Sequence, residues 1–348
     1  MSRKINLGKV RGKDYVLTEA DRLEIAQKIV PNATAEAVSL IDAYYGYEGE
    51  NDILGLQVDY ENKTFTRLAG AIGLSAGTDF DKFPMYGGMK RCNIKSNGEI
   101  TAYYGEGGYA DDNTATQTMV EMPKFYYKVV PLKLEKIEDG PGYHIRKANY
   151  YITDKQYPGF KLHPAFINEQ GDEIDKFYYS AYEGYLTENG NYYNDATHME
   201  TTAKTVDPKI HTISSRANRK PISGQNFKLY RSSEEQCIAK LGSGWHLETM
   251  KAHSAIQFLM MIEYGKLNMQ PTSSTDKSAF AYGVCNTTAP YESVNRCATT
   301  GATASLGNKT GVAASTSFEY YDVTTKTKKT EIRTDWQSSS CSYRGIEN

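Results

Sequence analysis

The chain has 348 residues, of which 40 are Lys or Arg and 42 are Asp or Glu, so its formal net charge is −2. This length can bury the cores of two or three domains, and without an excess of cations nucleic-acid binding is not expected to be the main activity. No apolar run of about 18 residues occurs and no signal peptide is recognised at the start, so neither a membrane span nor a secretion signal is expected.

Residues 1–50 are predicted to form a small helical neck. The first helix begins near Thr18 and Asp21, a variant of the capping box, and ends before Pro31. A second helix is expected from about 34 to 45, because apolar residues recur there at helical spacing and a glycine follows. An amphipathic helix at the start of a chain is usually a packing element, although it also suits a trimeric or docking neck.

Residues 51–140 are predicted to be rich in β-strands. Apolar residues alternate on both sides of a turn at 61–63 and again around a turn at 96–98, which predicts two hairpins. Residues 120–130 have the composition of one strand, which Pro123 interrupts at an edge or a bulge.

Residues 141–348 are predicted to form a third, mixed domain. Strands are expected at about 143–152 and 176–186, and a polar surface loop at 188–195. Two helices follow, one that starts at a capping box of Ser232 and Glu235 and ends at Gly242, and a longer one at 248–264. Towards the end the chain is rich in Thr, Ser, Ala and Gly, and short strands are expected at 302–305, 317–323 and 330–333, with a hairpin tip at 324–330.

No set of residues builds a recognisable catalytic or metal site, so no catalytic residue, metal ligand or cofactor is assigned. The six histidines lack a ligand-like spacing, and His163 and His246 are interpreted as structural. The acidic clusters at 79–81, 111–113 and 171–173 do not follow a calcium-loop pattern. The five cysteines are expected to be mostly buried and reduced, and the alternative is a single Cys285–Cys297 or Cys297–Cys341 bridge.

Tyrosine is the composition outlier, with 28 copies against 11 Phe and 2 Trp. A tyrosine ring gives a large contact area for little rotamer entropy and keeps a polar tip, which is typical of interfaces. Half-exposed strands of a sheet-rich fold also favour tyrosine, and both interpretations stay open.

Several segments occur in a defined order: the sequence MVEMPKFYYK at 119–128, PGFKLHPAFI at 158–167, the GW pair at 244–245 and YRGIEN at 343–348. Together they resemble a family of bacteriophage and prophage virion proteins of tail-fibre type. A segment at 10–21 resembles a module found in tail-associated proteins of phages of Gram-positive bacteria. The resemblance covers nearly the whole chain. It implies an α+β fold with a helical neck at 1–50, a β-rich middle at 51–140 and a domain at 141–348 like C-type lectins and formylglycine-generating enzymes.

Several members of that family resemble targets of diversity-generating retroelements, in which rewritten codons near the C-terminus alter a binding face. The family usually continues past the Gly-Ile-Glu-Asn block, whereas this sequence stops at Asn348. The expectation is therefore either a fragment or a protein that has lost its last strands. Formylglycine-generating enzymes use a pair of reactive cysteines near the C-terminus, and this sequence has no such pair.

The resemblance implies a non-enzymatic virion protein at the tail tip or fibre that binds a bacterial surface receptor, either protein or glycan. Its expected partners are other phage structural proteins and further copies of itself, with a homotrimer favoured, and neither nucleic acid nor membrane insertion is involved. It would be made in the host bacterial cytoplasm and released by lysis. The alternative is a purely structural component of a baseplate, tail or head decoration, and a third hypothesis is a cell-wall hydrolase or oxidase on the same scaffold. The candidate ligand contacts are Tyr320, Tyr321, Trp336, Ser338, Ser340 and Tyr343, although core packing is preferred for Trp336.

Overall fold

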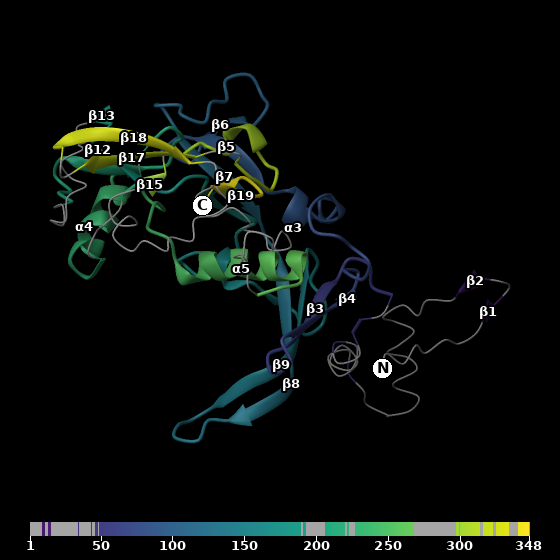
Figure 1. The fold of residues 1–348 in the computed structure, drawn as a ribbon. Helices are drawn as coiled ribbons and strands as arrows, with labels where there is room; N and C mark the ends of the chain where they lie inside the picture. The colour runs from purple at the N-terminus through teal and green to yellow at the C-terminus, as the bar shows by residue number, and fades with distance from the viewer. Residues whose placement is uncertain are drawn as a thin grey trace. The chain divides into compact units, whose positions relative to one another are not determined.

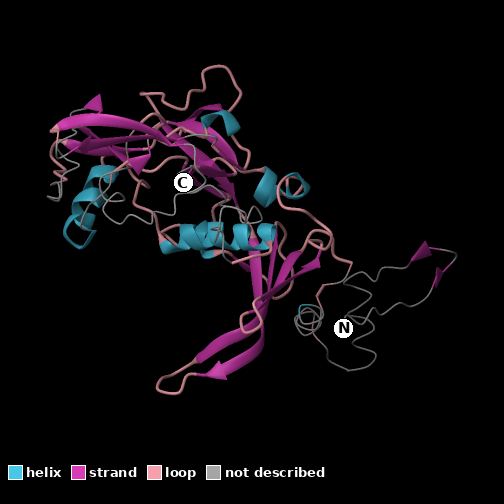
Figure 2. Cartoon of the chain, in the orientation of Figure 1, coloured by secondary structure: helices cyan, strands magenta, loops and turns pink. Residues whose placement is uncertain are grey.

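The computed structural model shows an α+β protein made mostly of antiparallel sheets with few helices (Figures 1 and 2). It divides into two compact units, each assembled from three separate stretches of the chain. Unit 1 comprises Met1–Gly87, Pro123–Asp175 and His253–Leu267, and unit 2 comprises the remaining residues. The structure describes residues 49–188, 206–219, 227–267 and 300–313, and the shorter pieces 9–10, 13–14, 34, 43, 46–47, 191–192, 221–222, 297–298, 316–322, 325–333 and 340–347.

Unit 1 is built on a five-stranded sheet. Its strands follow the order β10 (Lys161–Leu162), β8 (Tyr126–Lys136), β9 (Tyr143–Thr153), β3 (Leu54–Asp59) and β4 (Thr64–Ala69). The hairpin predicted around 61–63 is confirmed, because β3 and β4 pair on either side of this turn. The carboxylate of Asp59 accepts the main-chain N–H groups of Glu61 and Asn62 at 3.2 and 3.0 Å, which fixes the turn.

Strands β8 and β9 form a long hairpin, seen as the teal ribbon in Figure 1. The strand predicted at 143–152 is thus confirmed as β9. The domain boundary expected between 140 and 141 falls in the turn of this hairpin. The contiguous division into 51–140 and 141–348 therefore differs from the observed units, because main-chain pairing joins residues on both sides of that boundary into one sheet.

The strand predicted at 120–130 is in fact two strands in two different sheets. Strand β7 (Gln117–Pro123) ends at Pro123 and belongs almost wholly to unit 2, whereas β8 begins at Tyr126 in unit 1. Proline has no N–H to donate to a neighbouring strand, which is consistent with the end of β7 at Pro123. The prediction of a single interrupted strand is corrected accordingly.

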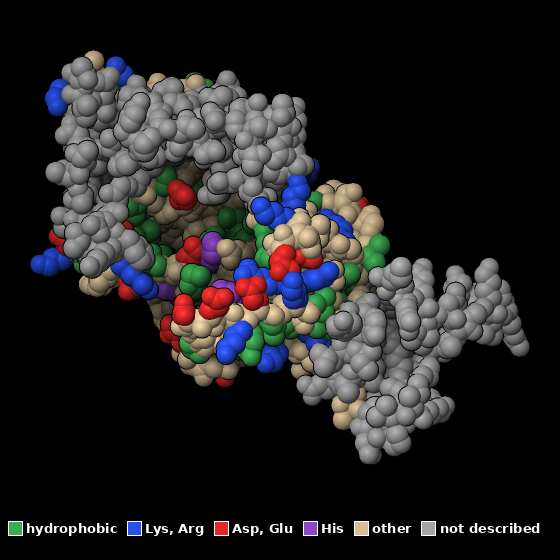
Figure 3. Space-filling model, turned by 60° about the horizontal axis from the view of Figure 1, so that its bottom comes forward, with side chains coloured by type: hydrophobic (Ala, Val, Ile, Leu, Met, Phe, Trp, Pro, Cys, Tyr) green, Lys and Arg blue, Asp and Glu red, His purple; other side chains and the backbone are tan. Residues whose placement is uncertain are grey.

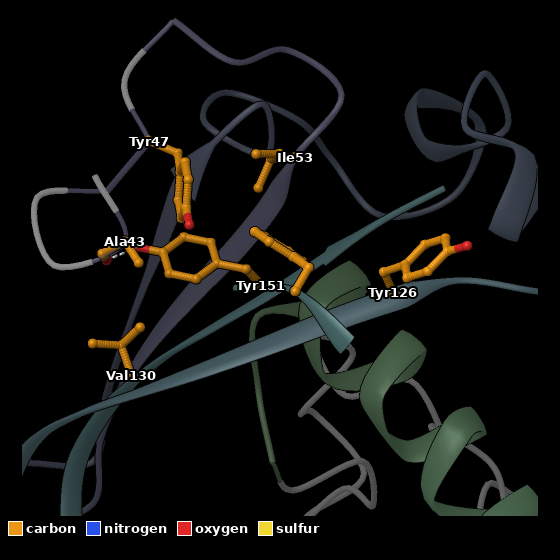
Figure 4. Packing of buried hydrophobic residues seen from close by; sticks show 7 residues of the cluster. Ala43, Tyr47, Ile53, Tyr126, Val130 and Tyr151 are labelled. Carbon is orange, nitrogen blue, oxygen red and sulfur yellow. Dashed lines mark hydrogen bonds between the residues drawn. The ribbon is translucent and has the colours of Figure 1, made fainter. Parts of the chain in front are cut away.

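The core of unit 1 depends on tyrosines whose polar tips are satisfied (Figure 4). The ring of Tyr47 packs edge to face on Tyr151 and Phe160, with centroids 5.0 and 5.6 Å apart. The Tyr151 hydroxyl donates to the carbonyl oxygen of Ala43 at 2.6 Å. Ala43 is in a helical conformation. The rest of the predicted helix at 34–45, apart from Thr34, and the whole predicted helix at 18–30 lie outside the described residues.

Helix α5 (Met250–Tyr264) confirms the helix predicted at 248–264, and Gly265 ends it with a φ of 63°. Arg67 of β4 donates from Nη1 to the carbonyl oxygen of Ile262 at 2.6 Å and from Nη2 to that of Glu263. These last-turn carbonyls have no partner inside the helix, and a cation there also complements the helix dipole. Unit 1 further contains the short strands β1 (Lys9–Val10) and β2 (Lys13–Asp14) and the short helix α3 (Pro84–Gly87). It also contains two 3₁₀-helices, η1 (Thr78–Phe80) and η2 (Pro164–Phe166).

Unit 2 contains a four-stranded sheet in the order β11 (Lys176–Ser180), β7, β5 (Lys90–Ile94) and β6 (Ile100–Tyr103). The hairpin predicted around 96–98 is confirmed as β5 and β6. The strand predicted at 176–186 is two strands, β11 and β12, the second of which lies in another sheet. The described residues of unit 2 also form three three-stranded sheets. The first contains β13 (Asn191–Tyr192), β12 (Tyr185–Glu188) and β14 (His211–Ser214), and the second contains β15 (Cys297–Ala298), β17 (Thr316–Asp322) and β18 (Thr327–Arg333). The third contains β16 (Gly311–Val312), β19 (Cys341–Tyr343) and β20 (Ile346–Glu347).

Three local predictions in unit 2 have different outcomes. Strands β17 and β18 confirm strands at 317–323 and 330–333, but the hairpin tip predicted at 324–330 is wrong in its second half, since β18 already begins at Thr327. The strand predicted at 302–305 is wrong, since η4 (Ala304–Leu306) is a short helix there. The capping box of Ser232 is also wrong, because helix α4 (Phe227–Ala239) begins more than one turn before Ser232, which therefore lies inside it.

Candidate binding surface

The six predicted contact residues have different positions in the structure. Tyr320 and Tyr321 are in β17, opposite Lys329 and Lys328 of β18. Ser340 and Tyr343 are buried, so these two side chains offer no surface to a partner as they are packed here. For them the expectation of a surface contact is corrected, because Tyr343 is in β19, the central strand of its sheet, and Ser340 directly precedes that strand. Trp336 and Ser338 lie outside the described residues, and their assignment remains a prediction.

One buried arginine holds residues 343–347, which we call the C-terminal block, in the interior of unit 2. The fully buried Arg91 side chain of β5 donates from Nε to the carbonyl oxygen of Gly345 at 2.6 Å. Its Nη1 contacts the Tyr182 hydroxyl at 2.9 Å and Asp111 Oδ1 at 3.3 Å, and its Nη2 contacts Thr303 Oγ1 at 3.4 Å. The guanidinium also lies 4.9 Å from the centroid of the Tyr182 ring. A buried cation with hydrogen-bond acceptors around it in this way has a structural role.

A buried carboxylate fixes the same block from its other end. Glu347 accepts the main-chain N–H groups of Gly301 and Thr303 at 2.7 and 2.9 Å, and the Thr303 hydroxyl as well. The main-chain N–H of Glu347 in turn donates to the carbonyl oxygen of Ala181 at 2.8 Å. Arg91 and Glu347 thus share Thr303 as a hydrogen-bond partner.

The thiols that the structure describes in full are poor nucleophiles. Cys92, Cys237 and Cys341 are free and buried. Burial raises the pKa of Cys92 and of Cys341 to about 12, which leaves almost no thiolate at neutral pH. Because Cys341 is free, the alternative Cys297–Cys341 bridge is not formed; Cys285 lies outside the described residues.

His163 has a structural position, in agreement with its interpretation from the sequence. It caps η2, where Nδ1 accepts the main-chain N–H of Ala165 at 3.3 Å. Burial lowers the pKa of His163 to about 4, so its ring is neutral at physiological pH. The rings that surround it belong to Phe125, Tyr127, Phe166 and Phe258.

The described residues offer no site for a metal ion, since no three His, Cys, Asp or Glu side chains among them gather closely enough to bind one. Within that same part of the chain, no helix is both long and apolar enough to cross a membrane. On the face shown in Figure 3, the basic and acidic side chains of described residues lie interspersed. A large patch of one sign, which a polyanion or polycation would require, is not seen on that face.

The best candidate for a binding surface is one face of the sheet β11–β7–β5–β6, which we call the tyrosine face. It consists of the half-buried rings of Tyr103, Tyr178 and Trp245 and the ion pair of Glu121 with Lys176. Glu121 Oε2 accepts the Tyr103 hydroxyl at 2.7 Å and the Lys176 ammonium at 2.9 Å. Beneath these groups lie the buried side chains of Cys92, Ile94 and Met119.

Electrostatics hold the tyrosine face in one protonation state around neutral pH. Burial, aided by the bond to Glu121, raises the pKa of Tyr103 to about 12. The bond to Glu121 raises the pKa of Lys176 as well. The Tyr103 phenol therefore stays neutral and the Lys176 ammonium stays charged around neutral pH.

The excess of tyrosine is visible in the sequence, but it does not by itself point to these residues. Lys176 and Tyr178 are two apart on one strand, and this period of two was a usable signal. The approach of Tyr103 to Glu121 was not readable, since it depends on the order in which β6, β5 and β7 lie side by side. Comparison of the chain with protein-family models, with curated proteins and with solved structures gives no match.

Proposed function

We propose that the protein is a non-enzymatic virion component at a phage tail tip or fibre that binds the bacterial surface, with the tyrosine face as a contact surface. The observation that carries the proposal is a half-exposed aromatic face beside a solvent-accessible ion pair. Tyr and Trp supply contact area at low entropic cost, which suits recognition of a macromolecule more than chemical turnover. The ordered resemblance to phage virion proteins supports the same function.

The test is binding of the labelled, multimerised protein to a panel of Gram-positive and Gram-negative cells. Multimerisation is needed because tail proteins gain avidity through repetition, and each single site can be weak. Saturable binding to one strain, lost on heat denaturation of the protein, is the expected result. Equal background on every strain at high valency would contradict the proposal.

A second candidate function is a purely structural virion component that contacts other phage proteins. It is favoured by the half of the β8–β9 hairpin next to its turn, where Leu134, Tyr143 and Ile145 are 50, 62 and 39% exposed. Leu134 pairs with Ile145, and Tyr143 is two residues before Ile145 in β9, so these side chains share one face of the ribbon. A two-stranded ribbon is only marginally stable alone in water, and an apolar face on it favours a protein partner.

The two functions make different demands on the same particle. In a structural component, Leu134→Ser with Ile145→Ser would block incorporation into the virion, and the chain would be enclosed by other subunits in a cryo-EM map. In a host-binding protein, substitutions on the tyrosine face would leave incorporation intact and reduce adsorption of the particles to cells.

A further inference from the structure

We infer that the tyrosine face binds an uncharged oligosaccharide. The inference rests on the proposed function and deepens it by naming the chemical class of the receptor. A sugar ring has apolar C–H faces and a rim of hydroxyls, each of which both donates and accepts hydrogen bonds. It therefore matches a surface of aromatic rings with a few oriented polar groups.

Sheet geometry places the polar groups and the tyrosines of this surface on the same side. Tyr103 of β6 lies directly opposite Cys92 of β5, and Cys92 lies directly opposite Met119 of β7. Residues that pair directly across strands share a face, and Glu121 shares it too because it is two residues from Met119. The hydroxyl of Tyr103 consequently reaches over β5 to the carboxylate of Glu121.

The third ring of the surface is fixed in place by its own hydrogen bond. The indole Nε1–H of Trp245 donates to the carbonyl oxygen of Ser96 at 2.9 Å. Because the donor is already used, Trp245 offers a ligand its ring face and not its N–H. A ring held in this way loses little entropy when a sugar packs against it.

The ion pair keeps unused hydrogen-bonding capacity. Both contacts to Glu121 fall on Oε2, and among the described residues no group donates to Oε1. The Lys176 side chain is 42% exposed, against 15% for Glu121, and an ammonium has three N–H groups to donate. A ligand with adjacent hydroxyls can donate to Glu121 Oε1 and accept from Lys176, as a sugar diol does.

The charges around the tyrosine face balance, which favours an uncharged ligand over an anionic one. Exposed Lys90 lies opposite Glu121 in the strand register, and exposed Glu106 accepts the main-chain N–H of Tyr103 at 2.8 Å. Two cations, Lys90 and Lys176, thus stand against two carboxylates. A phosphate-rich polymer would gain no net attraction here and would meet the carboxylate of Glu121 at the centre.

The experiment is a titration of the full chain with neutral gluco-, galacto- and manno-tetraoses and with a glycerol phosphate oligomer of similar length, followed by ligand-observed NMR. A neutral tetraose should bind and the phosphate oligomer should not. Tyr178→Ser should weaken the affinity about tenfold, through loss of one aromatic contact. Glu121→Gln should also weaken it, because the amide has a single acceptor oxygen, which Tyr103 and Lys176 already use, and its NH2 group cannot accept from the diol. Tyr143→Ser, at an exposed tyrosine of unit 1, is the matched control and should leave the affinity unchanged.

The inference is overturned if no neutral tetraose binds at concentrations up to about 10 mM, or if Tyr178→Ser binds as well as the unchanged protein. Preferential binding of the phosphate oligomer would overturn it too. Cell adsorption separates this failure from that of the proposed function. If cells are bound equally by the unchanged protein and by Tyr178→Ser, host binding stands and the inference fails. If a tetraose binds but no cells do, the inference stands and host binding fails.

Discussion

Arg91 and Gly345 are joined by a 2.6 Å hydrogen bond from the guanidinium Nε to the main-chain carbonyl oxygen, across 254 positions of sequence. This bond connects an early strand of unit 2 to its C-terminal block. It also explains why Gly345, with a φ of 97°, has so little space: an added Cβ would lie 3.0 Å from Arg91 Cγ. The C-terminal block and the buried arginine therefore depend on each other.

Arg91→Met is expected to lower the free energy of unfolding by about 3–5 kcal/mol, because it leaves Asp111 without its cation and Gly345 without its donor. Urea denaturation followed by circular dichroism measures the change. Arg146→Met is the control, since Arg146 pairs with Glu135 on an exposed ribbon and its removal should change little. Equal effects of the two substitutions would contradict the role given to Arg91.

Arg67→Met tests the end of α5. The guanidinium satisfies two carbonyl oxygens of the last helical turn, so its loss is expected to destabilise unit 1 by about 1–3 kcal/mol. Hydrogen exchange should show earlier opening of the amides near the helix C-terminus. Arg231→Met, which removes an exposed pair with Glu235 in α4, is the matched control. Unchanged exchange in α5 would count against this capping role.

Gly55→Ala tests the close packing of β3. An added Cβ would lie 2.6 Å from the ring of Tyr151 and 2.9 Å from Leu68 Cβ, so a side chain or strand must shift. Overpacking of this kind is expected to cost about 1–3 kcal/mol and to lower the melting temperature. Gly107→Ala meets nothing within 4 Å and should be nearly neutral. A tolerated Gly55→Ala would mean that the Tyr151 ring can move freely.

Local signals in the sequence predicted local structure, whereas long-range pairing remained beyond them. The turns at 61–63 and 96–98 determine their hairpins because the turn residues and the alternating strands are neighbours. The division of the chain into units could not be read, since it depends on β9 pairing with β3 and on the change of sheet after Pro123. The binding surface was missed for the same reason, because Tyr103 and Glu121 meet only across an intervening strand.

His163 should make the protein sensitive to mild acid. The ring is buried and neutral, with Nδ1 accepting from Ala165 and Nε2 3.4 Å from the Ser254 hydroxyl, and burial lowers its pKa to about 4. Above about pH 6.5 neither the folded nor the unfolded chain takes up a proton at this residue, so it makes no pH-dependent contribution. Between pH 6.5 and 4 only the unfolded chain takes one up. The free energy of unfolding therefore decreases as the pH is lowered from 6.5 to 4, and the loss approaches about 3 kcal/mol below pH 4.

The test compares the pH dependence of unfolding in His163→Asn with that of the unchanged protein. Asparagine can still cap η2, so the variant removes the titrating ring while it keeps an acceptor for Ala165. Its free energy of unfolding should decrease less steeply as the pH is lowered from 6.5 to 4. The difference in slope should be at most that of one bound proton. His144→Gln, at an exposed position of β9, should leave the slope unchanged. Identical slopes for His163→Asn and the unchanged protein would mean that His163 is protonated in the folded chain, and the aromatic rings around it would then have to open in acid.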